Sequence, residues 1–532
     1  MDEETQAPNA INHRELTSEL VSGLRQSNNE QTQFDIQSSI LPVIDIDGPN
    51  IDPCIVSSRF IDSSNGYGLH ERRAGQENPL DADSFYKTYQ KLIPYKNTNS
   101  FSRQDAIDAT MSIILPPSQT LIPGGSHEEN LLFYHYVCNI SVVMTPIDDG
   151  HNPWKSTYPS IAVRDLSSSS TRALYHAILA QSAYFLANVK GPVRGKGENL
   201  SAMRYFGMAI RELRESLMEP SKDYISVLAA LLTIILGEHV FKATSRGWRN
   251  HLQGAAGFVT QYLAQQPWRL SYDAWIITQN FALSYVIAQT VGSCSATAAN
   301  NNIDIYDVLC DVMARPGFGY TIGATARLIK AIYKARQLEE QMTAAGFSSP
   351  SVNFQDMSKN VCVQVEEIIQ QLQIPLNDEV EVIMKRQPEP QHRDVVQTRV
   401  QLHFHLFNSA VMIYLLRVVL RHPPSAVFDY VWEVLNDTMT FINMGGGGCV
   451  SIWPVFIAAA EAYTPKLQEM ADSCLIYLEG KVTGNRKDVR RVVHQVWADR
   501  GQLVAERQCD PGEVLVDWRA IMKRLDVDIL LL

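Results

Sequence analysis

From about residue 126 to its end, the chain repeats apolar residues at helical spacing almost without interruption. Apolar side chains recur every three or four residues, which places them on one face of an α-helix. Alternation of apolar and polar residues between hairpin turns, which is typical of β-strands, is scarce. The sequence therefore predicts an all-α fold, with a large single helical domain of roughly a dozen or more helices over residues 126–532.

The most apolar segments predict the centre of this domain. Residues 167–189 are apolar on nearly every face and begin with serines suited to a helix N-cap. Residues 199–219 keep a polar face, so we expect an outer helix there. Residues 224–237 form an apolar run of about fourteen residues, shorter than the roughly twenty that span a membrane. We therefore predict a buried core helix there and no membrane contact.

Residues 1–125 have a different composition. The segment LRQSNNEQTQFDIQSS is rich in amides and serine, and the short apolar islands after it are broken by glycine and proline. Such a segment buries too little apolar surface to fold alone, which predicts a mostly disordered leader or linker. The acidic N-terminus has no apolar export segment, so we expect a soluble, intracellular protein.

Charge and cysteine spacing argue against two classes of site. The formal net charge of −11 disfavours broad contact with nucleic acid, which needs clustered basic side chains. The cysteines include no CxxC pair, the spacing on which zinc modules depend. Cys138 and Cys474 lie in apolar runs, which predicts buried free thiols. We predict neither a metal site nor a cofactor.

The stretch GWRNHLQGAAG, residues 247–257, allows two interpretations: a catalytic histidine beside a glycine-rich loop, or a packing device between helices. A helix that begins near Trp248 aligns one stripe of side chains: Trp248, Leu252, Ala255, Val259 and Tyr262. The small residues 254–257 would allow a neighbouring backbone to approach closely. His251 lies at the edge of the stripe, and no carboxylate or nucleophile lies at a spacing that would prime it. We therefore favour packing.

Other suggestive motifs do not predict a binding site. His403 and His405 are two residues apart on a predicted helix, so they point in nearly opposite directions and cannot share one metal ion. The glycine-rich stretches 191–199 and 444–450 lack phosphate-loop spacing and predict linkers between helices. Residues 45–52 lack the later ligands of a calcium loop.

A basic segment near the C-terminus predicts the solvated face of an amphipathic helix. Its basic residues are Arg486, Lys487, Arg490, Arg491 and, further on, Arg500, and its apolar face holds Val489, Val492, Val493 and Trp497. No Ser-His-Asp arrangement, carboxylate pair or nucleotide fingerprint emerges along the chain, so we predict no catalytic residue.

Several motifs in a fixed order over about 400 residues resemble the fungal-specific transcription factor domain, the helical regulatory region of zinc binuclear cluster regulators. The motifs are an Asn-Pro-Trp ending, a helix around a histidine, a Trp-x-x-His-Leu-x-Gly-Ala pattern, a Trp-Pro-x-Phe-x-Ala segment and a closing Asp-Trp-Arg turn. The signature residues are Asn152, Pro153, Trp154, His176, Trp248, His251, Gly254, Trp453, Pro454, Asp517, Trp518 and Arg519. The resemblance implies structural roles for them and no catalytic residue.

The resemblance implies a nuclear regulator or co-regulator, which can shuttle with the cytoplasm, and not an enzyme. Regulators of this kind begin with six clustered cysteines that bind zinc and place a helix in DNA. Here only Cys54 precedes residue 130, so no direct DNA-binding module is visible. We therefore expect action through other proteins, a DNA-bound regulator or the transcription machinery, in a metabolic or secondary-metabolite pathway. A small-molecule effector in an aromatic-lined cavity would switch the protein.

Two alternatives stay open. In the first, the protein is a DNA-binding activator whose zinc cluster was lost by truncation of the gene model. In the second, the regulator fold has been recruited as a metabolic enzyme, with its ligand cavity as the active site; helical pockets suit apolar ligands.

Overall fold

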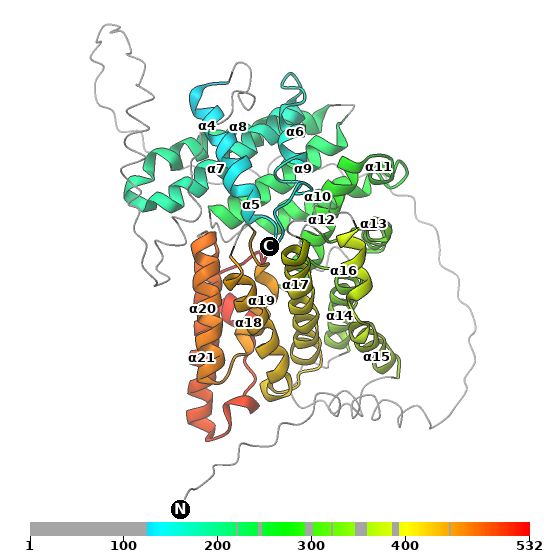
Figure 1. The fold of residues 1–532 in the computed structure, drawn as a ribbon, viewed down its shortest axis with the longest axis vertical. Helices are drawn as coiled ribbons and strands as arrows, with labels where there is room; N and C mark the ends of the chain where they lie inside the picture. Colours follow the sequence, from blue (N-terminus) through cyan, green and yellow to red (C-terminus); the bar gives the residue numbers. More distant parts are fainter. Residues whose placement is uncertain are drawn as a thin grey trace, which may run out of the picture. The chain divides into compact units, whose positions relative to one another are not determined.

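The computed structural model describes residues 125–219, 222–242, 247–292, 302–320, 323–345, 359–385, 393–445, 448–482 and 484–532. Every element within these ranges is an α-, π- or 3-10 helix, and no strand occurs in them (Figure 1). The predicted all-α fold with a dozen or more helices is therefore confirmed. The predicted leader, residues 1–125, lies outside the described residues except for Gly125.

The first group of helices runs from residue 127 to residue 314. It comprises α4 (His127–His135), η3 (Tyr136–Ile140), α5 (Ser141–Val143), α6 (Thr157–Val163), α7 (Ser169–Arg194), α8 (Lys196–Met218), α9 (Tyr224–Ile235), η4 (Leu236–Phe241), α10 (Trp248–Thr260), α11 (Pro267–Leu270), α12 (Tyr272–Thr290) and α13 (Asn302–Ala314).

The second group runs from residue 326 onward. It comprises α14 (Ala326–Ala344), α15 (Lys359–Gln373), α16 (Asn377–Met384), α17 (Arg393–Ile413), η8 (Tyr414–Val419), η9 (Pro424–Val427), α18 (Phe428–Asn443), α19 (Ile452–Glu461), α20 (Pro465–Lys481), α21 (Arg486–Arg507), η10 (Pro511–Glu513) and α22 (Trp518–Arg524).

Helix α7 forms the centre of the first group, as its apolar sequence predicts. Nearly every residue from Ser169 to Leu186 is buried, so neighbours surround this part of the helix. Helix α8 packs along it and buries a stripe that includes Ala202, Tyr205 and Ala209, which leaves a polar face outside. The central helix and the outer helix are both confirmed.

The predicted linker at 191–199 is shorter than expected, because most of it is helical. Helices α7 and α8 are separated by a reversal at Gly191 and Gly195. Gly191 has a φ of +77°, which favours glycine, and a Cβ on Gly195 would lie 2.4 Å from the Ala187 carbonyl oxygen. The glycines therefore serve the reversal and the close packing of the hairpin.

Two long apolar segments lie in the interior. Helix α9 is buried along almost its whole length, which confirms the predicted core helix. A second segment, Arg393–Val419, is long and apolar enough by composition to cross a membrane, but 83% of its apolar window is buried in the fold. Its apolar character is therefore that of a core helix.

In the predicted linker at 444–450, the described residues 444–445 and 448–450 lie outside helices, between α18 and α19. The main-chain N–H of Cys449 donates to the carbonyl oxygen of Thr145 at 2.9 Å. Gly448 has a φ of +100°, and a Cβ there would lie 2.3 Å from the Pro146 carbonyl oxygen. This loop of the second group is therefore pressed against a loop of the first.

The thiols divide according to the helix face on which they lie. Cys474 is fully buried, as predicted, whereas Cys138 is exposed and the prediction for it was wrong. Cys138 lies in η3 between the buried residues Tyr136 and Ile140, so it points away from the face that they form. Apolar neighbours in sequence therefore did not imply burial.

Figure 1 shows helices α4 to α12 gathered in one group, helices α14 to α21 in another, and the C-terminus between them. Residues near the C-terminus contact the first group directly. The indole N–H of Trp248 donates to the carbonyl oxygen of Asp528 at 3.0 Å, and the Arg249 guanidinium forms an ion pair with the Asp528 carboxylate at 2.8 Å. The C-terminal segment therefore joins α10 to the second group.

Candidate functional site

An apolar cavity of about 100 Å³ lies where the two groups meet. Both groups supply its walls, which include Val143, Met144, Trp154, Tyr158, Phe241, Leu283, Phe407, Trp453, Val482 and Leu531. Two signature tryptophans, Trp154 and Trp453, are among them. The cavity therefore brings together motifs that are about 300 residues apart in the sequence.

Asn152 fixes the position of Trp154. Its side-chain amide donates to the carbonyl oxygen of Ser141 and to the carboxylate of Asp148, both at 2.9 Å, and its amide oxygen accepts from the Trp154 main-chain N–H at 3.0 Å. The Trp154 indole stacks on Tyr158 with ring centroids 6.2 Å apart. Its N–H is buried and has no acceptor. A buried donor without a partner is costly, so an occupant of the cavity that accepts a hydrogen bond would be favoured.

Trp453 lies at the start of α19 and does have a partner. Its indole N–H donates to the Thr290 hydroxyl at 2.8 Å, and the ring stacks on Phe407 at 5.8 Å. Pro454 follows in the first turn of α19, where main-chain N–H groups have no intrahelical acceptor. Thr290 ends α12, so this hydrogen bond joins the two groups.

Arg486 adds a charged group to the edge of the apolar cavity. It is buried and donates to the Asn485 side chain at 3.3 Å and to the main-chain oxygen of Leu532. Burial lowers the pKa of Arg486 to about 10, an effect that nearby Cys449 partly opposes. The prediction of a solvated face was wrong for this residue, because the C-terminal residues cover this end of α21.

A second cavity, of about 170 Å³, is lined by Arg417, Arg421, Glu461, Asp517 and Arg519 together with apolar side chains. The Glu461 carboxylate forms ion pairs with Arg417 at 2.9 Å and with the nearby Arg500 at 3.1 Å. All three side chains of this cluster are almost fully buried. The cavity is therefore lined in part by charged side chains that form buried ion pairs.

Arg500 is the second residue for which the prediction of a solvated face was wrong. Its guanidinium donates to the carbonyl oxygens of Ala460 and Ala462, each at 3.1 Å. Helix α21 packs against α19, α20, α22 and η10, so a side chain on its far side is also enclosed. The sequence period of α21 alone could not show this enclosure.

The closing motif Asp517-Trp518-Arg519 caps and anchors α22. The Asp517 carboxylate accepts from the Arg519 main-chain N–H at 2.9 Å, and Trp518 packs edge-on against Phe456 at 5.1 Å. The Arg519 guanidinium donates to the carbonyl oxygen of Thr290 and forms an ion pair with the carboxylate of Glu339.

Glu339 connects Arg519 to the interior. Its carboxylate accepts from the Tyr414 hydroxyl at 2.9 Å and forms an ion pair with Arg336 at 3.1 Å. Burial raises the pKa of Glu339, but the charges of Arg519 and Arg336 outweigh it and the pKa is lowered. Glu339 is therefore ionised, and the C-terminal motif is tied to α12 and α14.

The signature residue His176 lies in the first group, apart from both cavities. Its Nδ1 lies 2.8 Å from the Glu212 carboxylate, which also accepts from the Arg172 guanidinium at 3.0 Å. Burial raises the pKa of Glu212, but the hydrogen bonds and charges of His176 and Arg172 lower it overall. The pair joins α7 to α8.

The stretch that begins at Trp248 forms α10, largely as predicted. Trp248, Leu252, Ala255 and Val259 are buried, and Tyr262 is half-buried. Gly254 and Gly257 are exposed, and a Cβ on either would meet nothing within 4 Å. The expected close approach of a backbone at these glycines was wrong, because they lie beside the buried stripe rather than in it.

His251 does have a carboxylate close by, which sequence spacing did not reveal. Its Nε2 lies 3.5 Å from the carboxylate of Glu238, thirteen positions earlier in the chain. The side chain of His251 is 37% exposed. Helix α10, which carries His251, lines neither cavity.

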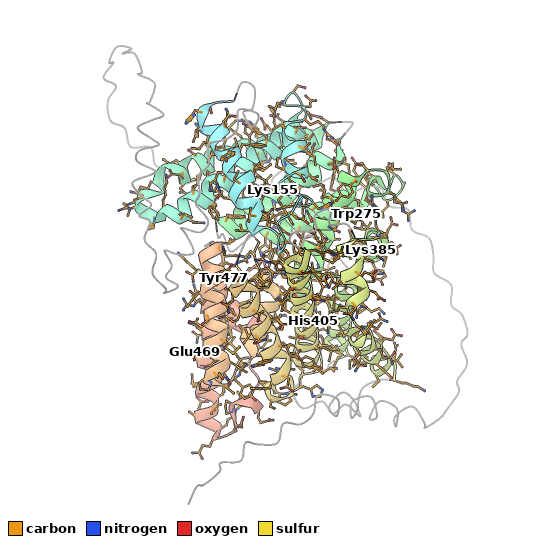
Figure 2. The ribbon with its side chains drawn as sticks, viewed as in Figure 1. Lys155, Trp275, Lys385, His405, Glu469 and Tyr477 are labelled. Carbon is orange, nitrogen blue, oxygen red and sulfur yellow. The ribbon has the colours of Figure 1, made fainter. Side chains whose placement is uncertain are left out.

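His403 and His405 point to opposite sides of α17, as predicted. His403 is buried, whereas His405 is exposed. Figure 2 labels His405 on α17. The His403 Nδ1 lies 2.9 Å from the Gly323 carbonyl oxygen, and Nε2 accepts from the Ser451 main-chain N–H at 3.1 Å. This arrangement fixes the neutral ring, and burial lowers the pKa of His403 to about 4. In the described part of the chain, no group of three His, Cys, Asp or Glu residues could hold a metal ion.

Sequence reasoning missed the cluster of Arg417, Glu461 and Arg500. A signal for it exists, because Arg417 and Glu461 are single charges within apolar runs, YLLRVVL and FIAAAEAY. A charged side chain in such a run is either exposed or paired in the interior. Arg421 carries no such signal, because the polar segment RHPPS surrounds it.

A comparison with known protein families matches residues 130–532 to the fungal specific transcription factor domain. Searches of curated proteins and of solved structures returned no significant match. The family match includes both cavities and every signature residue named above. The chain therefore belongs to the fungal-specific transcription factor domain family, which supports a role in fungal transcriptional regulation in general.

Proposed function

We propose that this protein is a transcriptional regulator or co-regulator whose state is set by a small apolar molecule in the cavity beside Trp154 and Trp453. Family membership supports the regulatory role. The observation that carries the effector is the buried Trp154 N–H, which has no acceptor and belongs to a residue that lines a mostly apolar cavity. A ligand with one hydrogen-bond acceptor would satisfy this donor.

The cavity limits the size of the effector. Typical ligand pockets hold roughly 300–1,000 Å³, whereas this cavity holds about 100 Å³. An apolar cavity of about 150 Å³ is sufficient for benzene. The proposed effector is therefore a compact apolar molecule with a single carbonyl or ether oxygen, and a larger one would have to displace wall residues.

A ligand at this position would act on the relation between the two groups of helices. Both groups line the cavity, and the Trp453–Thr290 hydrogen bond lies at the same junction. A ligand shifts a conformational equilibrium only if it binds one state more tightly. The proposed active state is the one in which both groups contact the ligand together.

The remaining parts of the proposal concern partners and location. We propose that the protein acts in the nucleus, through contact with a DNA-bound regulator or the transcription machinery. The net charge of −11 supports contact with proteins rather than broad contact with DNA. A metabolic pathway as the target rests on the kind of effector that the cavity would take.

The regulatory role is tested by sequencing RNA from a deletion strain and its parent, with the genomic region upstream of Met1 read alongside. A coherent set of genes that falls silent is the expected result. An upstream exon with six clustered cysteines would show that the protein contacts DNA itself. Changed metabolite levels with unchanged transcripts would overturn the regulatory proposal in favour of a metabolic enzyme.

The effector cavity is tested with a matched pair of probes on the purified full chain. Cyclobutanone carries an acceptor, whereas methylenecyclobutane has almost the same shape without one, and both are smaller than benzene. We expect cyclobutanone to raise the melting temperature more, and Trp154→Phe to remove that difference. Trp432→Phe, at a tryptophan that is 43% exposed, should leave it unchanged. Equal effects of the two probes on the wild type would contradict the role of the Trp154 donor.

A further inference from the structure

We propose that the arginine-lined cavity binds a small organic carboxylate, at a site separate from the proposed effector cavity. It holds about 170 Å³ beside residues 515–519, and Arg417, Arg421 and Arg519 contribute three guanidinium groups to its walls. Glu461 and Asp517 contribute two carboxylates. The ion pairs and hydrogen bonds that these charged groups already make leave positive charge available to a ligand.

The buried charges beside the cavity are not balanced one to one. Arg417 is 4% exposed and Arg500 is 2% exposed, and both bind the same oxygen of Glu461. A buried cation is stable only where other charges or dipoles compensate for lost hydration. For Arg500, the carbonyl oxygens of Ala460 and Ala462 supply that compensation.

Arg417 is compensated less completely. Its guanidinium donates to the carbonyl oxygen of His422 and to Glu461, but its Nε hydrogen is buried and has no acceptor. Arg417 also lines the cavity. A carboxylate there would supply a second negative charge for the two buried arginines.

Arg421 adds a guanidinium at the same cavity. None of the ion pairs in the described part of the chain includes it. It follows η8 with a φ of +59°, and the His422 main-chain N–H donates to the Leu416 carbonyl oxygen at 2.9 Å, so this left-handed residue belongs to the C-terminal cap of the helix.

The two carboxylates of the cavity oppose an anion only weakly. Glu461 is shared by two arginines, and Asp517 is exposed and accepts from the main-chain N–H of Arg519. Arg519 is itself directed to Glu339 and Thr290, so Arg417 and Arg421 are the principal donors of the proposed site.

The remaining lining favours an organic anion over a bare inorganic one. It consists of Val418, Leu515, Val516 and Trp518, which offer apolar surface to a short hydrocarbon body. A guanidinium binds a planar carboxylate through two parallel hydrogen bonds. The proposed ligand is therefore a monocarboxylate with a compact apolar body.

The test uses isothermal titration calorimetry on the purified full chain, with chloride setting a constant ionic strength. Benzoate is the probe, and benzamide is its uncharged analogue. We expect benzoate to bind and benzamide to bind at least tenfold more weakly. Arg421→Gln should weaken benzoate at least tenfold, since a hydrogen bond to a charged group is lost.

Control variants separate this site from other effects. Arg491→Gln removes a half-exposed guanidinium from α21 and should leave benzoate affinity unchanged. Trp154→Phe alters the apolar cavity and should also leave it unchanged, so failure of the effector proposal and failure of this one are distinguishable. Circular dichroism establishes that Arg421→Gln is folded, and Arg421→Lys, which keeps the charge, should retain part of the affinity.

Three results would overturn the proposal: no binding of benzoate at millimolar concentration, equal binding of benzamide, or full affinity in Arg421→Gln. Inorganic phosphate provides a further arm. If phosphate bound as tightly as benzoate, with the same dependence on Arg421, the site would bind oxyanions in general. The proposal that the ligand has an apolar body would then be overturned. Phosphate that binds weakly is the expected result.

Discussion

The two cavities have walls of opposite kinds. The cavity beside Trp154 is shaped by stacked aromatic rings and by hydrogen bonds at its tryptophans, whereas the cavity beside Arg417 is shaped by ion pairs between helices. An apolar wall loses free energy in proportion to the atoms removed. An ionic wall loses more when one partner is removed, because the other charge is left buried. The comparison shows that these regions should differ in sensitivity to single substitutions.

The largest effect is expected at Glu461. Glu461→Ala leaves Arg417 and Arg500 buried without their shared carboxylate. Breaking a buried ion pair in this way costs about 3–5 kcal/mol of unfolding free energy. Urea denaturation followed by far-UV circular dichroism measures the loss.

The control is Glu367→Ala, which removes a carboxylate that is 55% exposed and pairs with Lys334, itself 45% exposed. Exposed pairs of this kind contribute about 0.2–1 kcal/mol. Equal losses in the two variants would mean that Arg417 and Arg500 are hydrated, and the contrast between the cavities would disappear.

A backbone clash tests the wall of the apolar cavity. Gly448 precedes Cys449 and Val450, which line that cavity, and a Cβ on it would lie 2.3 Å from the Pro146 carbonyl oxygen. Gly448→Ala should cost about 2–4 kcal/mol, from the left-handed backbone together with overpacking. Urea denaturation measures it.

Gly445→Ala is the matched control in the same loop. Gly445 also has a positive φ, of +63°, but a Cβ there would meet nothing within 4 Å. This variant should lose only the conformational part, about 1–2 kcal/mol. If both variants lost the same amount, the loop would not be pressed against the first group.

Burial of the His403 ring makes the unfolding free energy of the protein sensitive to acid. Its folded pKa, about 4, lies below its ordinary value of 6.5, so the unfolded chain binds the proton more readily. The stability contributed by the neutral ring is present above pH 6.5 and is lost as pH falls from 6.5 towards 4. One proton corresponds to a slope of about 1.4 kcal/mol per pH unit.

His403→Gln removes this titration, so its unfolding free energy should fall less steeply between pH 6.5 and 4 than that of the wild type. His127→Gln, at an exposed histidine that begins α4, should keep the wild-type slope. Urea denaturation at several pH values gives both slopes. An unchanged slope in His403→Gln would show that the ring is protonated in the fold.

Sequence patterns predicted most of the fold and part of the candidate site. The period of three to four residues fixed α7, α9 and α10, because burial of one face depends on local spacing. Trp154 and Trp453 were singled out by the resemblance to the family and not by this period. The period could not predict that Arg500 is enclosed, since this depends on which helices surround α21.

Charge pairing across helices was the main source of error. Glu461 and Arg417 are 44 positions apart, and Arg519 and Glu339 are 180 apart, so no local pattern connects them. The same applies to His251 and Glu238. The exposed glycines of α10 caused an error of another kind. Small residues beside a buried stripe look the same in the sequence as small residues within it, so the sequence suggested close packing where there is none.

The smallest effect is expected at Trp154, and it isolates the value of one hydrogen bond. Trp154→Phe and Trp453→Phe delete the same atoms from two walls of one cavity, but the Trp154 N–H has no acceptor and the Trp453 N–H donates to Thr290. Loss of ring volume destabilises both variants, whereas removal of an unpaired buried donor offsets that loss at Trp154 alone. We expect Trp154→Phe to change the unfolding free energy by less than about 1 kcal/mol and Trp453→Phe to lose about 1–2 kcal/mol more. Urea denaturation of both variants in parallel measures the difference. If Trp154→Phe lost as much as Trp453→Phe, its indole would already have an acceptor in solution, such as water, and the proposed effector would have to displace it.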